Sequence, residues 1–204
     1  YGNQLEQITW KSSDDKVVTV DKEAGIVKAL KAGTVTLTAS FSKDKEITFE
    51  VVVKDSVVTD IPREEFDGIS SSANTEQASG EPAGSGVASA ATDGNSSTYW
   101  HSQWSGFTVS KENPAILTVD FGKELSIGGF KFQQRPGTNN GIVHKYHYEA
   151  FDEAGEKVAS SDTISVADAQ KAGGQWITSL FENGANVKTL KIYVEEGRGN
   201  FAAI

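Results

Sequence analysis

Apolar and polar residues alternate along much of this chain, and this two-residue period most constrains its fold. Along residues 34–41 the apolar side chains share one face: Val35, Leu37, Ala39 and Phe41. The same alternation recurs over 47–53, 115–121 and 190–194. Successive side chains of a strand point to opposite faces of a sheet, whereas a helix needs a period of 3.6 residues. We therefore predict an all-β protein.

One short helix is predicted within this pattern, over residues 166–172. Ser165 would cap its first turn, and Asp168 would complete a capping box. Gly173 and Gly174 follow and would end the helix quickly.

A change in composition divides the chain. Few apolar residues pair up in the stretch before Ile61-Pro62, and a residue that precedes proline is biased towards extended conformations. We predict a first domain over residues 1–55, a linker over 56–61 and a second domain over 62–204. Residues 70–86 are rich in Ser, Ala and Gly and predict an irregular loop.

Charge and composition exclude several classes of function. The 204 residues carry a formal net charge of -9, whereas nucleic acids and anionic membranes bind clustered Lys and Arg. The chain has no Cys, which excludes disulfides, thiol nucleophiles and thiolate metal sites. No apolar run is long enough to span a bilayer, so we expect no membrane insertion. Because the sequence starts with Tyr1 rather than Met, we expect it to be part of a longer protein.

The densest group of polar and aromatic residues is T-D-G-N-S-S-T-Y-W-H-S-Q-W, residues 92–104. Asp93, Asn95 and Thr98 place three side-chain oxygens close together around an Asp-Gly turn. A hard cation such as Ca²⁺ takes six to eight oxygen ligands, often from one tight loop. An ordinary turn, in which Asp93 bonds its own backbone, explains the same residues. These residues alone do not decide between a Ca²⁺ loop and an ordinary Asp-Gly turn.

Polar and aromatic residues outside the predicted strands form a second candidate group: His101, Arg135, Asn140 and Phe201. A sugar needs planar polar groups for its hydroxyls and an aromatic ring for its C–H face. A lone His is more often a surface or core residue, and Asn140-Gly141 also fits a type I′ hairpin turn. We assign Trp100 to the core and leave Trp104 undecided between core and rim.

The first domain resembles the bacterial immunoglobulin-like group 2 domain over about residues 8–53. The matching stretches are I-T-W-K-S-S-D-D-K-V-V-T-V-D and G-I-V-K-A-L-K-A-G-T-V-T-L-T-A, with Trp10, Ser12, Ser13, Val20, Gly25, Gly33 and Thr34. The resemblance implies an immunoglobulin-like β-sandwich that serves as a spacer or adhesive stalk. Such domains usually open with two further strands before the Trp, so we expect a partial sandwich here.

The second domain resembles the discoidin or coagulation-factor type C domain, specifically family 32 carbohydrate-binding modules. Besides residues 92–104, the motifs are P-A-I-L-T-V-D-F-G, Q-R-P-G-T-N-N-G-I-V-H-K-Y and G-N-F-A-A-I, in the family's order. The match covers about residues 61–204. It implies a jelly-roll-like β-sandwich whose ligand loops cluster at one end.

That resemblance also implies roles for single residues. His101 and Arg135 would bond the axial O4 of a galactose-type sugar, Asn140 a neighbouring hydroxyl, and Phe201 would stack on the ring. Trp104 joins this candidate set. A structural Ca²⁺ would be held by Ala91, Asp93, Asn95 and Thr98, and the family's C-terminal Glu ligand would fall just past Ile204.

Together these features predict a non-catalytic module that binds galactose or N-acetylgalactosamine residues of host or mucin glycans. We expect a monomer within a larger secreted or cell-surface bacterial protein that degrades glycans. The alternative is a discoidin-like adhesion module that binds a membrane surface or a protein. The sequence contains no nucleophile with a base and an orienting group. The resemblance to family 32 modules implies that a catalytic domain, a glycoside hydrolase or a mucin-directed protease, would lie outside this chain.

Overall fold

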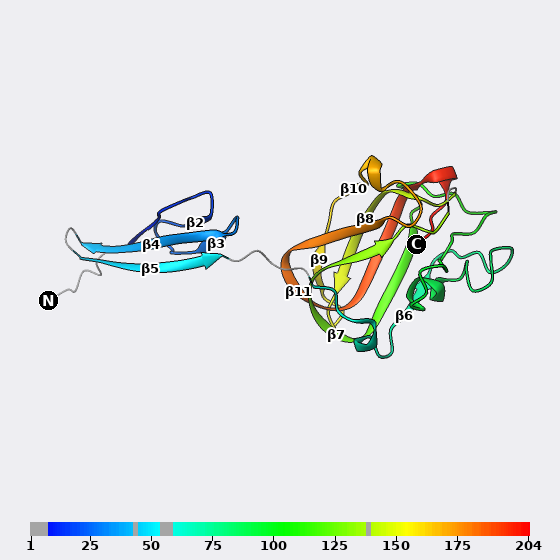
Figure 1. The fold of residues 1–204 in the computed structure, drawn as a ribbon, viewed down its shortest axis with the longest axis horizontal. Helices are drawn as coiled ribbons and strands as arrows, with labels where there is room; N and C mark the ends of the chain where they lie inside the picture. The colour runs from blue at the N-terminus through cyan, green and yellow to red at the C-terminus, as the bar shows by residue number, and fades with distance from the viewer. Residues whose placement is uncertain (1–7, 43–44, 54–58, 138–139) are drawn as a thin grey trace. The chain divides into compact units, whose positions relative to one another are not determined.

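The computed structural model describes residues 8–42, 45–53, 59–137 and 140–204 (Figure 1). The chain forms two compact units, Tyr1–Thr59 and Asp60–Ile204. Both are built from antiparallel strands, which confirms the all-β prediction. Residues 56–58, half of the predicted linker, lie outside the described part. No helix among the described residues is long and apolar enough to cross a membrane.

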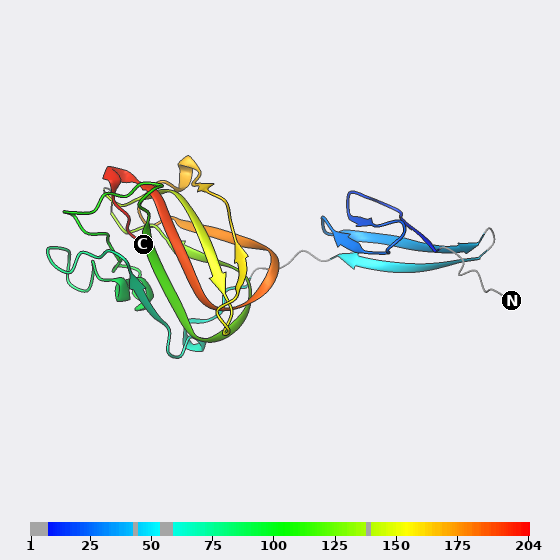
Figure 2. The ribbon, with the colours of Figure 1, turned by 180° about the vertical axis from the view of Figure 1, so that it is seen from behind.

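The first unit contains two small antiparallel sheets (Figures 1 and 2). Three strands form the larger sheet, in the order β1 (Thr9–Ser12), β4 (Gly33–Ser42) and β5 (Lys45–Val53). The smaller sheet pairs β2 (Val18–Val20) with β3 (Val27–Ala29). The sequence predicts that the family's first two strands are missing, and residues 1–7, where this would be tested, lie outside the described residues.

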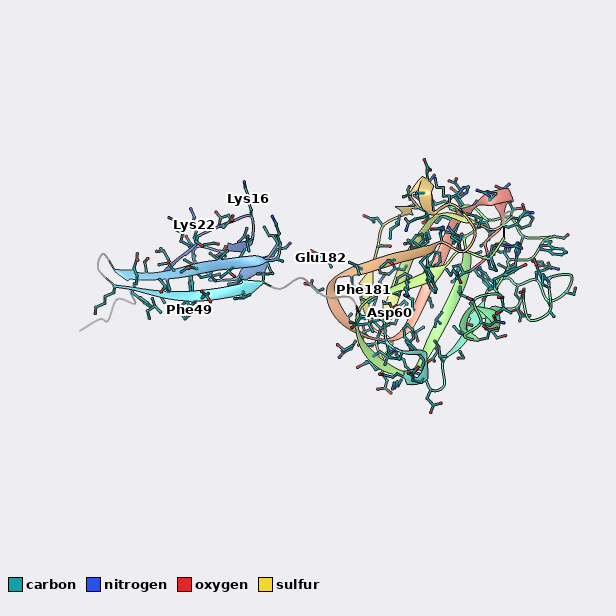
Figure 3. All side chains as sticks on the ribbon, in the orientation of Figure 1. Lys16, Lys22, Phe49, Asp60, Phe181 and Glu182 are labelled. Atoms are coloured by element: carbon teal, nitrogen blue, oxygen red, sulfur yellow. The ribbon has the colours of Figure 1, made fainter. Side chains whose placement is uncertain are left out.

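The core of this unit is small. Val18, Val35 and Leu37 are buried at its centre. Leu37 lies opposite Phe49 in the β4–β5 register, so both side chains share one face of the sheet. Phe49, labelled in Figure 3, is nevertheless 46% exposed and stacks on Trp10 at a ring separation of 6.1 Å. The alternation over 47–53 therefore marks a strand whose apolar face is only partly covered.

The second unit is built on one antiparallel sheet in the order β10-β8-β11-β7-β6, with β9 paired to β8. Its strands are β6 (Ser70–Ala73), β7 (Ala115–Gln133), β8 (Val143–Phe151), β9 (Lys157–Ser160), β10 (Ile164–Ser165) and β11 (Trp176–Gly197). Its 3₁₀ turns are η1 (Arg63–Glu65), η2 (Ala88–Thr92), η3 (Asp168–Gln170) and η4 (Arg198–Asn200).

The long strands β7 and β11 bend so that their paired halves form two layers. Their register shifts between Leu180 and Ala185, and such irregularities let a sheet bend. Phe130, in the second half of β7, then packs edge-to-face on Tyr148 of β8 at 5.1 Å. The main core lies between these layers and includes Trp100, which is 0% exposed. The assignment of Trp100 to the core is confirmed.

The predicted helix over 166–172 is wrong. Only η3 forms there, and Ser165 is the last residue of β10 instead of a helix cap. The backbone N–H of Val166 donates to the carbonyl of His144, and the Val166 side chain is 4% exposed. Burial of Val166 and continuation of the ladder on β8 keep this segment extended.

Three loops meet at one end of this sheet. The register pairs Ala73 with Leu117, Val194 with Ala115, and Val143 with Gly197. The segments 74–114, 134–142 and 198–204 therefore leave the sheet at the same end, as both ribbon views show (Figures 1 and 2).

Candidate functional site

Backbone pairing fixes the position of His101. Trp100 donates its N–H to the carbonyl of Ile204 at 2.7 Å and accepts the N–H of Ile204 at 3.1 Å. Ser102 donates its backbone N–H to the carbonyl of Ala202 at 2.8 Å. The Trp100 indole N–H donates to the carbonyl of Thr75 at 2.8 Å. These bonds hold His101 against the segment that carries Phe201.

The His101 imidazole is buried, with 1% of its surface exposed. Its Nδ1 lies 2.6 Å from the carbonyl oxygen of Ser102. A carbonyl only accepts, so Nδ1 carries the proton and Nε2 of the neutral ring carries a lone pair. Burial lowers the pKa of His101 below its ordinary 6.5, which favours this neutral form. Nε2 is thus a buried acceptor without a partner among the described residues.

Glu81 is a member of this cluster that the sequence did not reveal. Its side chain is 6% exposed, and Oε1 lies 3.9 Å from Nε2 of His101. The carboxylate accepts the Tyr99 hydroxyl at 2.6 Å and the Trp104 indole N–H at 3.1 Å. The loop predicted over 70–86 begins with strand β6, so the prediction is wrong for residues 70–73. Glu81 lies in the irregular remainder, where no periodic pattern distinguishes it from a solvated loop residue.

Arg135 contacts the same cluster from the loop after β7. Its Nη2 donates to the Tyr99 hydroxyl at 2.8 Å, and Nη1 donates to the backbone carbonyl of Asn140 at 3.1 Å. The guanidinium carbon lies 4.2 Å from the centre of the Tyr99 ring. Nε of Arg135 is buried and lacks a partner in the described structure. Burial and the bond to Glu81 raise the pKa of Tyr99 to about 12, so its hydroxyl stays protonated at neutral pH.

The aromatic residues lie beside His101. The rings of Phe201 and His101 are 5.5 Å apart, and the Trp104 ring stands edge-on to His101 at 6.4 Å. Trp104 is 47% exposed, so it lies at the rim of the cluster instead of in the core. A Cβ at Gly199 would come within 2.8 Å of Oδ1 of Asn140 and 3.2 Å of Cδ2 of Phe201. The structure therefore brings all five candidate binding residues together.

The hairpin reading of Asn140-Gly141 is wrong. The loop follows β7 and precedes β8, but β11 lies between these strands in the sheet. A type I′ turn would join two adjacent strands, whereas this loop crosses over a third. Residues 138 and 139 of the loop lie outside the described residues.

The proposed calcium loop holds a compact group of oxygens. Asp93 accepts the Asn95 N–H at 2.8 Å, as the Asp-Gly turn reading predicts. The Thr98 hydroxyl lies 2.7 Å from Asp93 Oδ2 and 2.8 Å from the carbonyl of Asn95. The two acceptors share this one hydroxyl proton. Ala91 lies just before it in η2. Among the described residues, no group of three His, Cys, Asp or Glu is placed to hold a metal.

Comparisons with known proteins identify the families of both domains. Residues 69–204 match the F5/8 type C domain, and residues 2–53 match the bacterial Ig-like domain (group 2). The family 32 module of NanJ from Clostridium perfringens, solved in complex with galactose, is 26% identical. The alignment covers 71% of this chain and 92% of that module, with a TM-score of 0.56.

A second family 32 module from Clostridium perfringens, solved with GalNAc-beta-1,3-galactose, shares the fold. It is 23% identical with a TM-score of 0.56, over 70% of this chain and 92% of the module. A curated relative is the A type blood N-acetyl-alpha-D-galactosamine deacetylase of Flavonifractor plautii, 28% identical over 81% of this chain. That match spans only 22% of the deacetylase. The chain belongs to the F5/8 type C, or discoidin, domain family, with a bacterial immunoglobulin-like group 2 domain preceding the discoidin domain.

Proposed function

We propose that the second unit is a carbohydrate-binding module that recognises galactose-type sugars, galactose or N-acetylgalactosamine, through the cluster around His101. The module binds and does not catalyse. The first unit serves as a spacer. The longer protein is secreted or displayed on a bacterial surface, and a domain outside this chain acts on host or mucin glycans.

The observation that carries this proposal is a pair of buried polar atoms without partners. Four buried side-chain N or O atoms lack a hydrogen-bond partner in the described part of the chain, and two lie in this cluster: Nε2 of His101 and Nε of Arg135. An unsatisfied buried polar atom is costly, so such atoms are retained where a ligand satisfies them. One is an acceptor and the other a donor. A sugar hydroxyl can donate to the first and accept from the second.

Two neighbouring features suit the rest of a sugar ring. The Glu81 carboxylate already accepts hydrogen bonds from Tyr99 and Trp104. A carboxylate has about four acceptor positions, so Glu81 can also accept a hydrogen bond from a second hydroxyl of the sugar. Phe201 and the exposed Trp104 provide aromatic surfaces for apolar C–H groups. The NanJ module, 26% identical, was solved with galactose, which supports this class of sugar.

We also propose that Ca²⁺ pins the loop at Asp93, Asn95 and Thr98. The support is the group of oxygens around the Thr98 hydroxyl and the oxygen preference of Ca²⁺. The carbonyl of Ala91 would be a further ligand. The ion would hold the loop that leads to His101, and it would not touch the sugar.

Titration with galactose, N-acetylgalactosamine and glucose tests the proposal. A few hydrogen bonds and one stacking contact should give micromolar to millimolar affinity, roughly 4–8 kcal/mol, for the two galactose-type sugars. Glucose, the C4 epimer, should bind more weakly. Isothermal titration calorimetry or NMR titration measures the three affinities, and equal affinity for glucose would refute recognition of the axial hydroxyl.

Two equally exposed tryptophans provide a matched control. Trp104 is 47% exposed in the cluster, and Trp176 is 49% exposed at the start of β11. Trp104→Ala should weaken galactose binding, whereas Trp176→Ala should leave it unchanged. Equal effects would contradict the site. Binding of wild type to phospholipid vesicles without any sugar affinity would favour the adhesion alternative.

A further inference from the structure

We infer that Tyr99 is a positioning residue, a spacer that keeps the Glu81 carboxylate and the Arg135 guanidinium from pairing directly, so that both keep an edge free for the ligand. This inference rests on the proposed function, because it concerns the same site. Tyr99 is itself 3% exposed, so its hydroxyl is not available to a ligand.

The direction of the two hydrogen bonds is fixed by chemistry. A guanidinium has no acceptor, so Arg135 donates and the Tyr99 oxygen accepts, at 2.8 Å. The single phenol proton is then donated to Glu81, at 2.6 Å. The chain of donors runs from Arg135 through Tyr99 to Glu81. The raised pKa of Tyr99 agrees with a phenol that keeps its proton.

A spacer matters because the two charged groups have a strong alternative. Arginine and carboxylate form short, often bidentate ion pairs, which would use the edges that a ligand needs. With the phenol between them, each charged group has one hydrogen bond to Tyr99. Nε of Arg135 then keeps a free N–H, and Oε1 of Glu81 stays near Nε2 of His101.

Removal of the hydroxyl should therefore change binding more than stability. In Tyr99→Phe the ring still fills its place and still lies under the guanidinium. Glu81 loses a donor and Arg135 loses an acceptor, so the two side chains satisfy each other. A sugar then has to displace an ion pair. We expect galactose affinity to fall about tenfold or more, which corresponds to about 1.4 kcal/mol.

Tyr146→Phe is the matched control. Tyr146 is 1% exposed, and its hydroxyl is 2.6 Å from the Ser179 hydroxyl in the core. Both variants remove one buried phenol hydroxyl. Calorimetric titration with galactose should show the loss only for Tyr99→Phe, while thermal melts show similar small shifts for both. Full galactose affinity in Tyr99→Phe would overturn the spacer role, and so would a large loss in Tyr146→Phe.

A double-mutant cycle separates spacing from simple packing. In a Glu81→Gln background the ion pair cannot form, so adding Tyr99→Phe should cost little further affinity. If the two losses add, Tyr99 does not act by separating the charges.

A crystal structure of ligand-free Tyr99→Phe gives a readout that needs no sugar. A direct contact between Glu81 and Arg135 supports the inference, and wild-type positions of both side chains overturn it. If wild type fails to bind galactose while the variant forms this contact, the proposed function fails and the spacer role stands.

Discussion

Gly199 lies between Asn140 and Phe201, so an alanine at this position should disturb two proposed sugar ligands at once. Its backbone has a φ of +73°. An added Cβ would lie 2.8 Å from Oδ1 of Asn140 and 3.2 Å from Cδ2 of Phe201. Real Cβ atoms do not come as close as 2.8 Å, so the Asn140 side chain has to move, and the tight 3.2 Å contact also presses on the Phe201 ring.

The expected magnitudes follow from these contacts. The left-handed conformation costs an alanine about 1–2 kcal/mol, which lowers the Tm of a domain of this size by about 2–8 °C. Loss of a ligand hydrogen bond from Asn140 costs about 1 kcal/mol. A weakened aromatic contact at Phe201 costs about 0.5–1.5 kcal/mol more. Together they predict a loss of galactose affinity between roughly tenfold and seventyfold.

Gly155→Ala is the control, because it carries the strain without the contacts. Gly155 has a φ of +84°, and nothing lies within 4 Å of an added Cβ there. Thermal melts should show similar losses of stability for both variants, whereas galactose titration should show weaker binding only for Gly199→Ala. Equal galactose affinities in the two variants would refute the placement of Asn140 and Phe201 in the site.

Galactose binding should depend on pH, calcium should stabilise the second unit, and truncation of the core should destabilise the first unit. Because burial lowers the pKa of His101 below 6.5, galactose affinity should be constant above that pH and fall as the pH drops through the folded-state pKa. The free energy of unfolding should also fall as the pH drops, since His101 takes up a proton at a higher pH in the unfolded chain than in the folded protein. Galactose titrations measure the affinity across this pH range, and thermal melts measure the stability. Calcium at about 1 mM should raise the Tm, and Asp93→Asn should abolish that rise. Asp152→Asn, which alters another turn-capping aspartate, should not. In the first unit, Leu37→Ala should cost about 2–5 kcal/mol in urea unfolding and Phe49→Ala less, since Leu37 is 4% exposed and Phe49 is 46% exposed.

Local alternation predicted strands well but not their extent. The runs at 115–121 and 190–194 are strands, and they pair with each other in β7 and β11. Glycines usually signal turns, yet β7 continues through Gly122, which has a φ of +76°. A Cβ there would lie 2.5 Å from the carbonyl of Asp67, so this glycine allows a close approach within a bent strand. Sequence rules do not separate the two uses of glycine.

The candidate site was predictable only in part. His101, Arg135, Asn140 and Phe201 are unusual side chains in loops, and the resemblance to family 32 modules grouped them. Glu81 has no such signal, because its role depends on burial and on its bonds to Tyr99 and Trp104. Long-range packing gives a loop glutamate its function, and a local sequence pattern does not record it.

The pairing of Trp100 and Ser102 with residues 202–204 has a consequence for biosynthesis. Ser102 Oγ accepts the N–H of Ala202, a residue one hundred positions later. On the ribosome the cluster around His101 cannot assemble until residues 202–204 have emerged, so until then Trp100 lacks its backbone partner. Retention on immobilised galactose would then report completed folding of the whole second unit, and it would separate intact molecules from those clipped before residue 202.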